Sequence, residues 1–300
     1  MNNVGVCESM LGDPGGLDRV RESMRLAEES GDAEAIGRAY SNLPATLAMY
    51  LRHGEAAEIS NRGREVSRRL GAPGYEWFHA ANEASSLAEL GRYEDAEALA
   101  QESLEHTRTV KAAPGIANAG ATLVQTLLPR GRYEEAREIM DEIVPIARGL
   151  GGNEFLALCL RLEAELELAR GNINAARLAI QEALDVVLAT PAVWHVLELL
   201  LPTAQLLPER AEALLERVRP AVRDPAFQAT VEEAEGVLYG DRDRFARAAD
   251  IYRSFDVSYR EARCRLESGD LDRARELIRR FGLENGPLGA RLREIESANL

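Results

Sequence analysis

One six-residue phrase recurs in this chain at a fixed interval of about 40 residues, and it constrains the fold more than any other feature. The phrase begins with glycine and ends with alanine, and its clearest copies are Gly91–Ala96 (GRYEDA), Gly131–Ala136 (GRYEEA) and Gly171–Ala176 (GNINAA). Weaker copies lie at Leu51–Ala57 (LRHGEAA) and Gly269–Ala274 (GDLDRA). A period of roughly 20 to 50 residues is typical of a solenoid, in which each unit buries its apolar face against the next. The sequence therefore predicts stacked repeats along almost its whole length.

Each repeat is predicted to be a hairpin of two helices. The glycine suits the left-handed cap at the end of the first helix, and acidic side chains such as Glu94 and Asp95 follow in the first turn of the second. The alanine of the phrase shares a helix face with an aliphatic residue eight positions later, so both are expected in the core: Ala96 with Leu104, Ala136 with Val144, and Ala176 with Leu184. The predicted helices cover 2–11, 15–30, 34–50, 54–70, 73–90, 93–109, 113–129, 133–149, 153–170, 173–189, 192–206, 208–219, 226–239, 243–254, 257–268, 271–281 and 284–298.

These helices predict an all-α fold, a right-handed superhelical solenoid of about eight antiparallel hairpins with one further helix at the C-terminal end. No run of residues has the alternation of a strand. We expect one elongated domain over residues 1–300, with the more regular repeats at 34–189, an irregular region at 190–225 and C-terminal repeats at 226–300. The irregular region lacks the repeated phrase and is crowded with prolines, which predicts a shortened repeat there.

Numbered from the turn glycine, the units resemble tetratricopeptide repeats in their leucine before the glycine (Leu87, Leu127), tyrosine two positions after it (Tyr93, Tyr133) and alanine five positions after it (Ala96, Ala136, Ala176). They are longer than that family's standard unit, which has about 34 residues. They also carry Ala80, Gly120 and Leu160 where the family has a large aromatic residue. Such degenerate units are similar to the helical-repeat region of bacterial STAND-type signalling ATPases, LuxR-type regulators and some adenylate cyclases. The segments with this resemblance are Asn2–Asp13 and Tyr259–Leu277.

Composition narrows the class of partner. The formal net charge is −14, with 36 basic and 50 acidic residues, which argues against nucleic acid because phosphates require a concentrated basic surface. The chain begins with no basic segment that leads into an apolar run, and no stretch reaches the roughly 18 apolar residues of a membrane span. We therefore expect a cytoplasmic protein without a membrane partner. Three cysteines, remote from one another, are expected to be reduced thiols.

No catalytic motif is present in the sequence. Lys111, the only lysine, is not in a phosphate-binding loop, and no serine lies in a G-x-S-x-G turn. The four histidines are far apart in sequence, which excludes a local zinc-binding pair. Adjacent glutamates diverge around a helix and do not converge on a substrate. The sequence predicts no enzyme activity, no cofactor and no metal. An all-α enzyme is a further alternative that would require a deep pocket with converging titratable groups.

In tetratricopeptide proteins the first helix of each hairpin lines a concave groove, and the resemblance implies a partner-binding surface here. An aromatic ring, amides and one arginine suit an extended peptide or a docked helix. Trp77, like Trp194, either anchors a partner or packs between hairpins. The residues implied for the groove are Asn42, Thr46, Trp77, Phe78, Ser85, Asn118, Gln125, Arg161 and Glu165.

Two functional hypotheses follow. The first is a non-catalytic scaffold that binds protein or peptide, as the sensory or regulatory region of a larger bacterial signalling ATPase or transcriptional regulator. Its partners would then include the ATPase or effector domains of the same parent chain, of which residues 1–11 would be a truncated continuation. The alternative is a receptor whose concave groove binds a small molecule or a signalling peptide.

Overall fold

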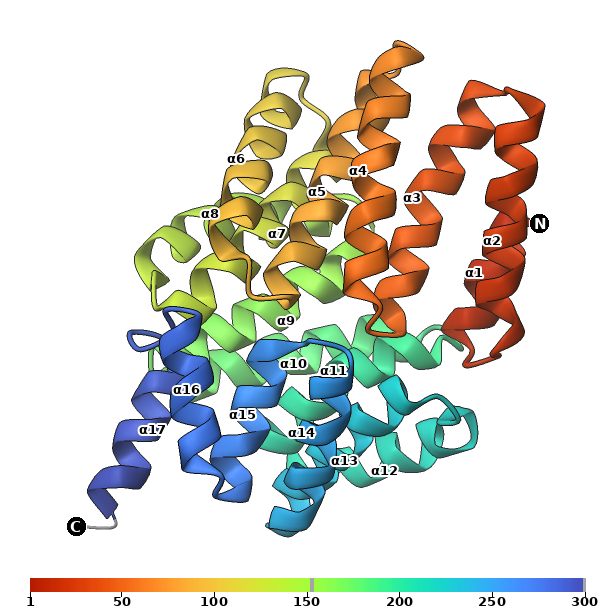
Figure 1. The fold of residues 1–300 in the computed structure, drawn as a ribbon. Coiled ribbons are helices and arrows are strands. Elements are labelled where there is room, and N and C mark those ends of the chain that lie inside the picture. Colours follow the sequence, from red (N-terminus) through yellow and green to blue (C-terminus); the bar gives the residue numbers. More distant parts are fainter. Residues whose placement is uncertain (152–153, 299–300) are drawn as a thin grey trace.

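The computed structural model describes residues 1–151 and 154–298, and within these ranges the regular elements are all helices. Seventeen α-helices follow one another there as antiparallel neighbours (Figure 1), which confirms the predicted all-α solenoid of hairpins. Predicted and observed bounds agree to within about two residues, except that α17 begins three residues later than predicted, at Pro287. The helices are α1 (Asn2–Met10), α2 (Gly15–Ser30), α3 (Ala33–Met49), α4 (His53–Arg69), α5 (Pro73–Glu89), α6 (Tyr93–Thr109), α7 (Ala113–Leu127), α8 (Tyr133–Gly149), α9 (Glu154–Ala169), α10 (Ile173–Leu188), α11 (Val193–Leu206), α12 (Pro208–Val218), α13 (Pro225–Tyr239), α14 (Arg242–Ser254), α15 (Ser258–Ser268), α16 (Leu271–Arg280) and α17 (Pro287–Ala298), with short 3-10 turns η1 (Leu128–Arg130) and η2 (Arg219–Ala221).

The recurring glycines form the turn inside each hairpin. Their φ angles are 79° at Gly91, 77° at Gly131 and 82° at Gly171, in the left-handed region that glycine adopts without a Cβ clash. At the first of them, the N–H of Gly91 donates to the Ala88 carbonyl at 3.0 Å and the next N–H, of Arg92, to the Leu87 carbonyl at 2.9 Å. The last carbonyls of α5 are thus satisfied, so the chain can reverse and begin α6 directly.

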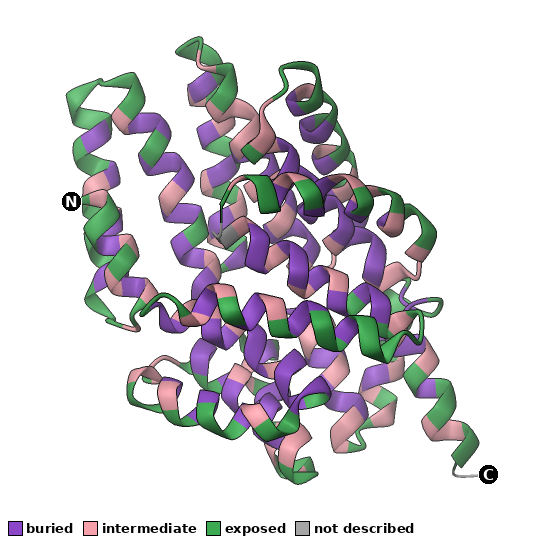
Figure 2. Ribbon diagram, turned by 180° about the vertical axis from the view of Figure 1, so that it is seen from behind, coloured by how far each residue is buried: buried purple, intermediate pink, exposed green. Residues whose placement is uncertain are grey.

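The predicted core positions are buried. The alanines of the repeated phrase are fully inaccessible, and the aliphatic residues eight positions later are at most 7% exposed, as predicted. Buried side chains form one hydrophobic cluster from Leu17 in α2 to Leu292 in α17. Figure 2 shows these residues concentrated on the central helices, with exposed residues at the turns and outer edges. The predicted division of the chain at 34–189, 190–225 and 226–300 stays a prediction.

The proline-rich segment forms the hairpin of α11 and α12, whose second helix is short. Helix α12 has 11 residues, whereas α10 in the preceding hairpin has 16. Pro208 begins α12, where a missing N–H is tolerated, and Pro202 lies inside α11.

The solenoid curls back until its C-terminal end meets its middle, as Figure 1 shows for α15 to α17 and the turns after α5 and α7. A Cβ atom added to Gly286 would lie 1.8 Å from the Pro129 carbonyl oxygen, and one added to Gly131 would lie 2.1 Å from the Asn285 carbonyl oxygen. The two backbones therefore touch where only glycine fits. We call this the closing contact, formed by residues 281–286 against Gly91 and residues 129–131.

Candidate binding cavity

A cavity of about 600 Å³ lies inside the curl, lined mainly by the first helices of six successive hairpins, α5, α7, α9, α11, α13 and α15, and by α17. The repeat explains this arrangement because equivalent positions in stacked hairpins face the same way. Ser85, Gln125, Glu165 and Gln205 are separated by one repeat interval each and all line the cavity, one from each of α5, α7, α9 and α11. The Ser85 hydroxyl donates to Oε1 of Gln125 at 3.2 Å, so the first two members of this row are in contact.

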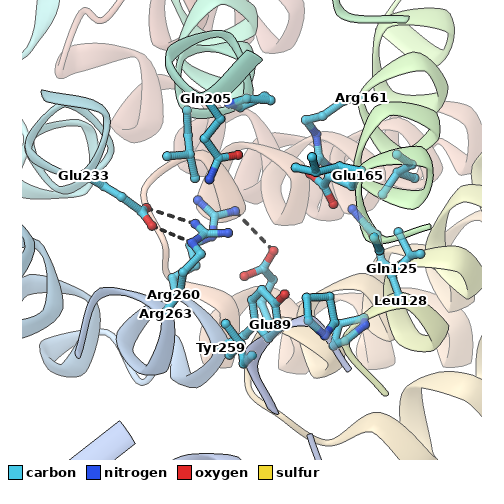
Figure 3. A pocket seen from close by; sticks show the side chains of 18 of the residues that line it. Glu89, Gln125, Leu128, Arg161, Glu165, Gln205, Glu233, Tyr259, Arg260 and Arg263 are labelled. Carbon is cyan, nitrogen blue, oxygen red and sulfur yellow. Dashed lines mark hydrogen bonds and ion pairs between the residues drawn. The ribbon is translucent and has the colours of Figure 1, made fainter. Parts of the chain in front are cut away.

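The opposite wall carries an ion pair buried between α13 and α15. Arg263 donates to both oxygens of Glu233, from Nε at 2.5 Å and from Nη2 at 2.9 Å (Figure 3). The Tyr252 hydroxyl donates to the same carboxylate at 2.9 Å. Such a bidentate pair with a third donor compensates for the loss of water around the Glu233 side chain, which is 2% exposed. This wall is therefore held in place by interactions within the C-terminal half of the chain.

A second ion pair joins residues that are 171 positions apart in sequence. Nη2 of Arg260, in α15, lies 3.2 Å from Oε1 of Glu89, at the end of α5 (Figure 3). Burial by itself raises the pKa of Glu89, but the positive charges around it, chiefly that of Arg260, and the hydrogen bond from Arg260 together lower that pKa to about 2. Glu89 is therefore a carboxylate throughout the physiological pH range. Across the cavity, Arg161 donates to Glu165 at 2.5 Å within α9.

Aromatic side chains line the cavity together with leucine, alanine and proline. The guanidinium carbon of Arg263 lies 5.7 Å from the ring centre of Tyr259, within the range of a cation–π contact. Tyr93 lies at the α5–α6 turn and is 2% exposed, and burial raises the pKa of its hydroxyl well above the usual value. Trp194 lines the cavity at the start of α11 and is half-buried. A ligand here would meet rings, amides and ion pairs together.

Four of the nine groove residues implied by the family resemblance line this cavity: Ser85, Gln125, Arg161 and Glu165. The other five lie elsewhere. Thr46 is fully buried and donates to the Asn42 carbonyl at 2.7 Å, while the Asn42 amide donates to the side chain of Asn2 at 2.8 Å. Helix α1 thus packs where the groove of the first full hairpin was expected.

The remaining three predicted residues are also outside the cavity. The ring of Trp77 stacks on His106 of α6 with centroids 4.6 Å apart, so it packs within its own hairpin. Phe78 and Asn118 are half-buried at other positions of α5 and α7. They lie in the first half of their helices, whereas the cavity lies at the C-terminal ends of α5 and α7 because those ends meet the closing contact.

Sequence reasoning missed two groups of cavity residues. Gln205 continues the row that starts at Ser85, and adding one more repeat interval to Glu165 would have found it although the repeated phrase is absent there. Glu89 of α5 and the α13–α15 wall, which includes Arg260, carry no such signal. Arg260 is remote from Glu89 in sequence, and only the curl of the solenoid brings that wall next to Glu89 and the start of the row.

No group of three or more His, Cys, Asp or Glu in the described part of the chain is placed to hold a metal ion. No helix among residues 1–151 and 154–298 is long and apolar enough to cross a membrane.

Comparison with known proteins gives a likeness in structure alone. The sequence matches no protein-family model and no curated protein. Its fold is similar to that of a Rap protein. The solved structure is described as a Rap protein complexed with competence and sporulation factor, and it aligns with a TM-score of 0.63 over 95% of this chain and 81% of that chain. At 12% sequence identity the likeness shows the fold, a tetratricopeptide-like array of antiparallel helix pairs.

Proposed function

We propose that this chain is a non-catalytic receptor that binds a short peptide in its central cavity. The observation that carries the proposal is the row of evenly spaced polar side chains, Ser85, Gln125, Glu165 and Gln205, along a cavity of about 600 Å³. This volume lies within the range of about 300 to 1,000 Å³ of ligand-binding pockets. The similar Rap protein is described in complex with competence and sporulation factor, which supports a ligand in the corresponding fold.

The chemistry of the walls favours a peptide over an apolar ligand. Glutamine amides both donate and accept, so Gln125 and Gln205 suit the alternating donors and acceptors of a peptide backbone. Carboxylates and guanidinium groups on both walls suit charged termini or side chains. Tyr259 and Trp194 offer broad contact surfaces at a low entropic cost.

Binding without catalysis is supported by how the titratable groups are paired. The cavity does bring such groups together, as the enzyme alternative requires. However, Glu89 pairs with Arg260 and Glu233 with Arg263, and the pKa of Glu89 is lowered to about 2. A general acid or base works best with a pKa near the operating pH, so Glu89 is poorly suited to either role.

We further propose that the receptor acts as the sensory region of a signalling protein, by controlling effector domains of the same parent chain or a separate partner protein. The resemblance of Tyr259–Leu277 to the helical repeats of signalling ATPases and LuxR-type regulators supports this role. In such an arrangement, a ligand bound inside the curl would favour one conformation of the solenoid over others. This shift would change the exposed outer surface that a partner contacts.

The test is thermal and chemical unfolding in the presence of peptide pools, with two matched tryptophan variants. A peptide at 100 times its dissociation constant should stabilise the wild type by about 2.7 kcal/mol. Ser85→Trp should fill part of the cavity and remove this gain. Ala45→Trp places the same ring at the equivalent repeat position of α3, which is exposed and outside the cavity, and should keep it. The proposal fails if no peptide stabilises the wild type, or if both variants respond as the wild type does.

A further inference from the structure

Where α5, α6 and α15 meet, the cavity wall has more hydrogen-bond donors than the Glu89 carboxylate satisfies. Arginine carries five N–H donors in a planar fork. In the described residues Arg260 uses one of its nitrogens, Nη2, to contact Glu89. The Tyr93 side chain lines the same cavity, and its hydroxyl is buried and has no hydrogen-bond partner in this part of the chain. Buried polar groups are rarely left unpaired, so this wall lacks an acceptor.

Glu89 accepts from only one of the guanidinium nitrogens of Arg260. Its single contact is 3.2 Å long, whereas charge-assisted pairs are typically about 2.7 to 2.9 Å. The other cavity arginines that meet a glutamate from another helix do so in the bidentate manner: Arg263 on Glu233 at 2.5 and 2.9 Å, and Arg291 on Glu267 at 2.7 and 3.0 Å. The guanidinium of Arg260 therefore has N–H donors that Glu89 does not use. The planar arrangement of these donors matches the two oxygens of a carboxylate.

The wall formed by α9 and α11 carries two carboxylates and one guanidinium, so its formal charge is negative. Glu165 accepts from Arg161 at 2.5 Å and is still exposed to 42% of its side-chain area, and Glu198, 3.6 Å from Nδ1 of His195, is exposed to 33%. Figure 3 shows Glu165 across the cavity from the Arg263–Glu233 pair. A ligand with an amino group at one end and a carboxylate at the other would meet acidic groups on α9 and α11 and the open guanidinium on α15. A short peptide with free termini carries both charges.

From this arrangement we infer that the cavity holds the free C-terminal carboxylate of a short peptide on Arg260, where it replaces Glu89 as the partner of the guanidinium fork. The inference rests on the proposed function and adds the chemical group that the receptor recognises. The peptide carboxylate gains the unused nitrogens of Arg260, and the unpartnered Tyr93 hydroxyl is a further donor in the cavity lining. Glu89 then acts as a placeholder that keeps the part-buried guanidinium paired in the empty receptor.

The inference predicts that binding depends on the charge of the peptide terminus. The probe is a random pentapeptide pool, synthesised once with a free acid and once with an amide at the C-terminus. The two pools are mixed in equal amounts, equilibrated with the full chain and recovered by ultrafiltration, and retained peptides are counted by mass spectrometry. We expect the wild type to enrich the acid over the amide about tenfold, which equals about 1.4 kcal/mol.

Three variants separate recognition from folding. Glu89→Gln keeps the volume, removes the competing carboxylate and should raise the enrichment further. The double variant Glu89→Gln, Arg260→Gln leaves no buried unpaired charge and should reduce the enrichment to about one. A control with the same chemical change, Arg108→Gln with Glu142→Gln, alters an exposed pair between α6 and α8 outside the cavity and should behave as the wild type.

The outcomes distinguish the inference from the function on which it rests. If acid and amide are retained equally, or if the double variant still enriches the acid, Arg260 does not read the carboxylate and the inference is overturned while peptide binding stands. Retention of neither pool overturns both. Competitors identify the anion: acetate should displace the acid pool, and displacement by inorganic phosphate at concentrations where acetate has no effect would make this a phosphate site and reject the inference.

Discussion

The closing contact gives a prediction whose size follows from the structure. Replacing Gly286 with alanine would put a Cβ atom 1.8 Å from the carbonyl oxygen of Pro129, and real Cβ atoms essentially never come within 3.0 Å of another heavy atom. Both partners are backbone, so neither can rotate away, and the start of α17 must move off η1. We therefore expect Gly286→Ala to open the curl at this point.

The cost depends on how far α17 detaches. Leu288 is 4% exposed and Leu292 is 8% exposed, and exposing a buried leucine costs about 1.5 to 3 kcal/mol. Complete detachment of α17 would thus lower the free energy of unfolding by about 3 to 6 kcal/mol, measured by urea titration, and would speed hydrogen exchange over residues 287–298. Gly74→Ala is the matched control, because a Cβ there meets nothing within 4 Å, and its effect should be below about 1 kcal/mol. Equal stability of the two variants, with unchanged exchange in α17, would refute the role of the closing contact.

Two further predictions concern buried titratable groups. Burial lowers the pKa of both His53 and His79 to about 4 from a usual value of 6.5, so unfolding takes up protons as the pH falls through this window. Between pH 7 and pH 5 each histidine should therefore remove about 2 kcal/mol of stability. The loss should be smaller by that amount in His79→Gln, and urea titrations showing the same pH dependence in both proteins would contradict this. The thiols should differ in reactivity, since Cys7 is exposed whereas Cys159 and Cys264 are buried, and burial raises the pKa of Cys159 to about 12. Mass spectrometry after iodoacetamide treatment should find one label in the native protein and three after unfolding; fast native labelling of Cys159 would count against the packing described.

The row of polar side chains shows how far a repeat can be used to predict a site. The resemblance to tetratricopeptide repeats implies Ser85, Gln125 and Glu165 for the groove, these three occupy equivalent positions in successive hairpins, and Gln205 extends the row by the same interval. Such positions can be predicted because each hairpin contacts mainly its neighbours, so a local pattern fixes which helix face points inward. The row does not extend back to α3, where Asn42 and Thr46 pack against other residues and do not line the cavity.

The helices, the turns and the buried faces can be predicted from local patterns, because glycine caps, acidic first turns and apolar spacing act within a single repeat. Closure of the curl and the cavity inside it arise from the packing of all the hairpins together. Closure depends on the sum of the small rotations between successive hairpins, including the short hairpin of α11 and α12. No local sequence pattern predicts that sum. The pair of Glu89 and Arg260, 171 positions apart, exists for that reason alone.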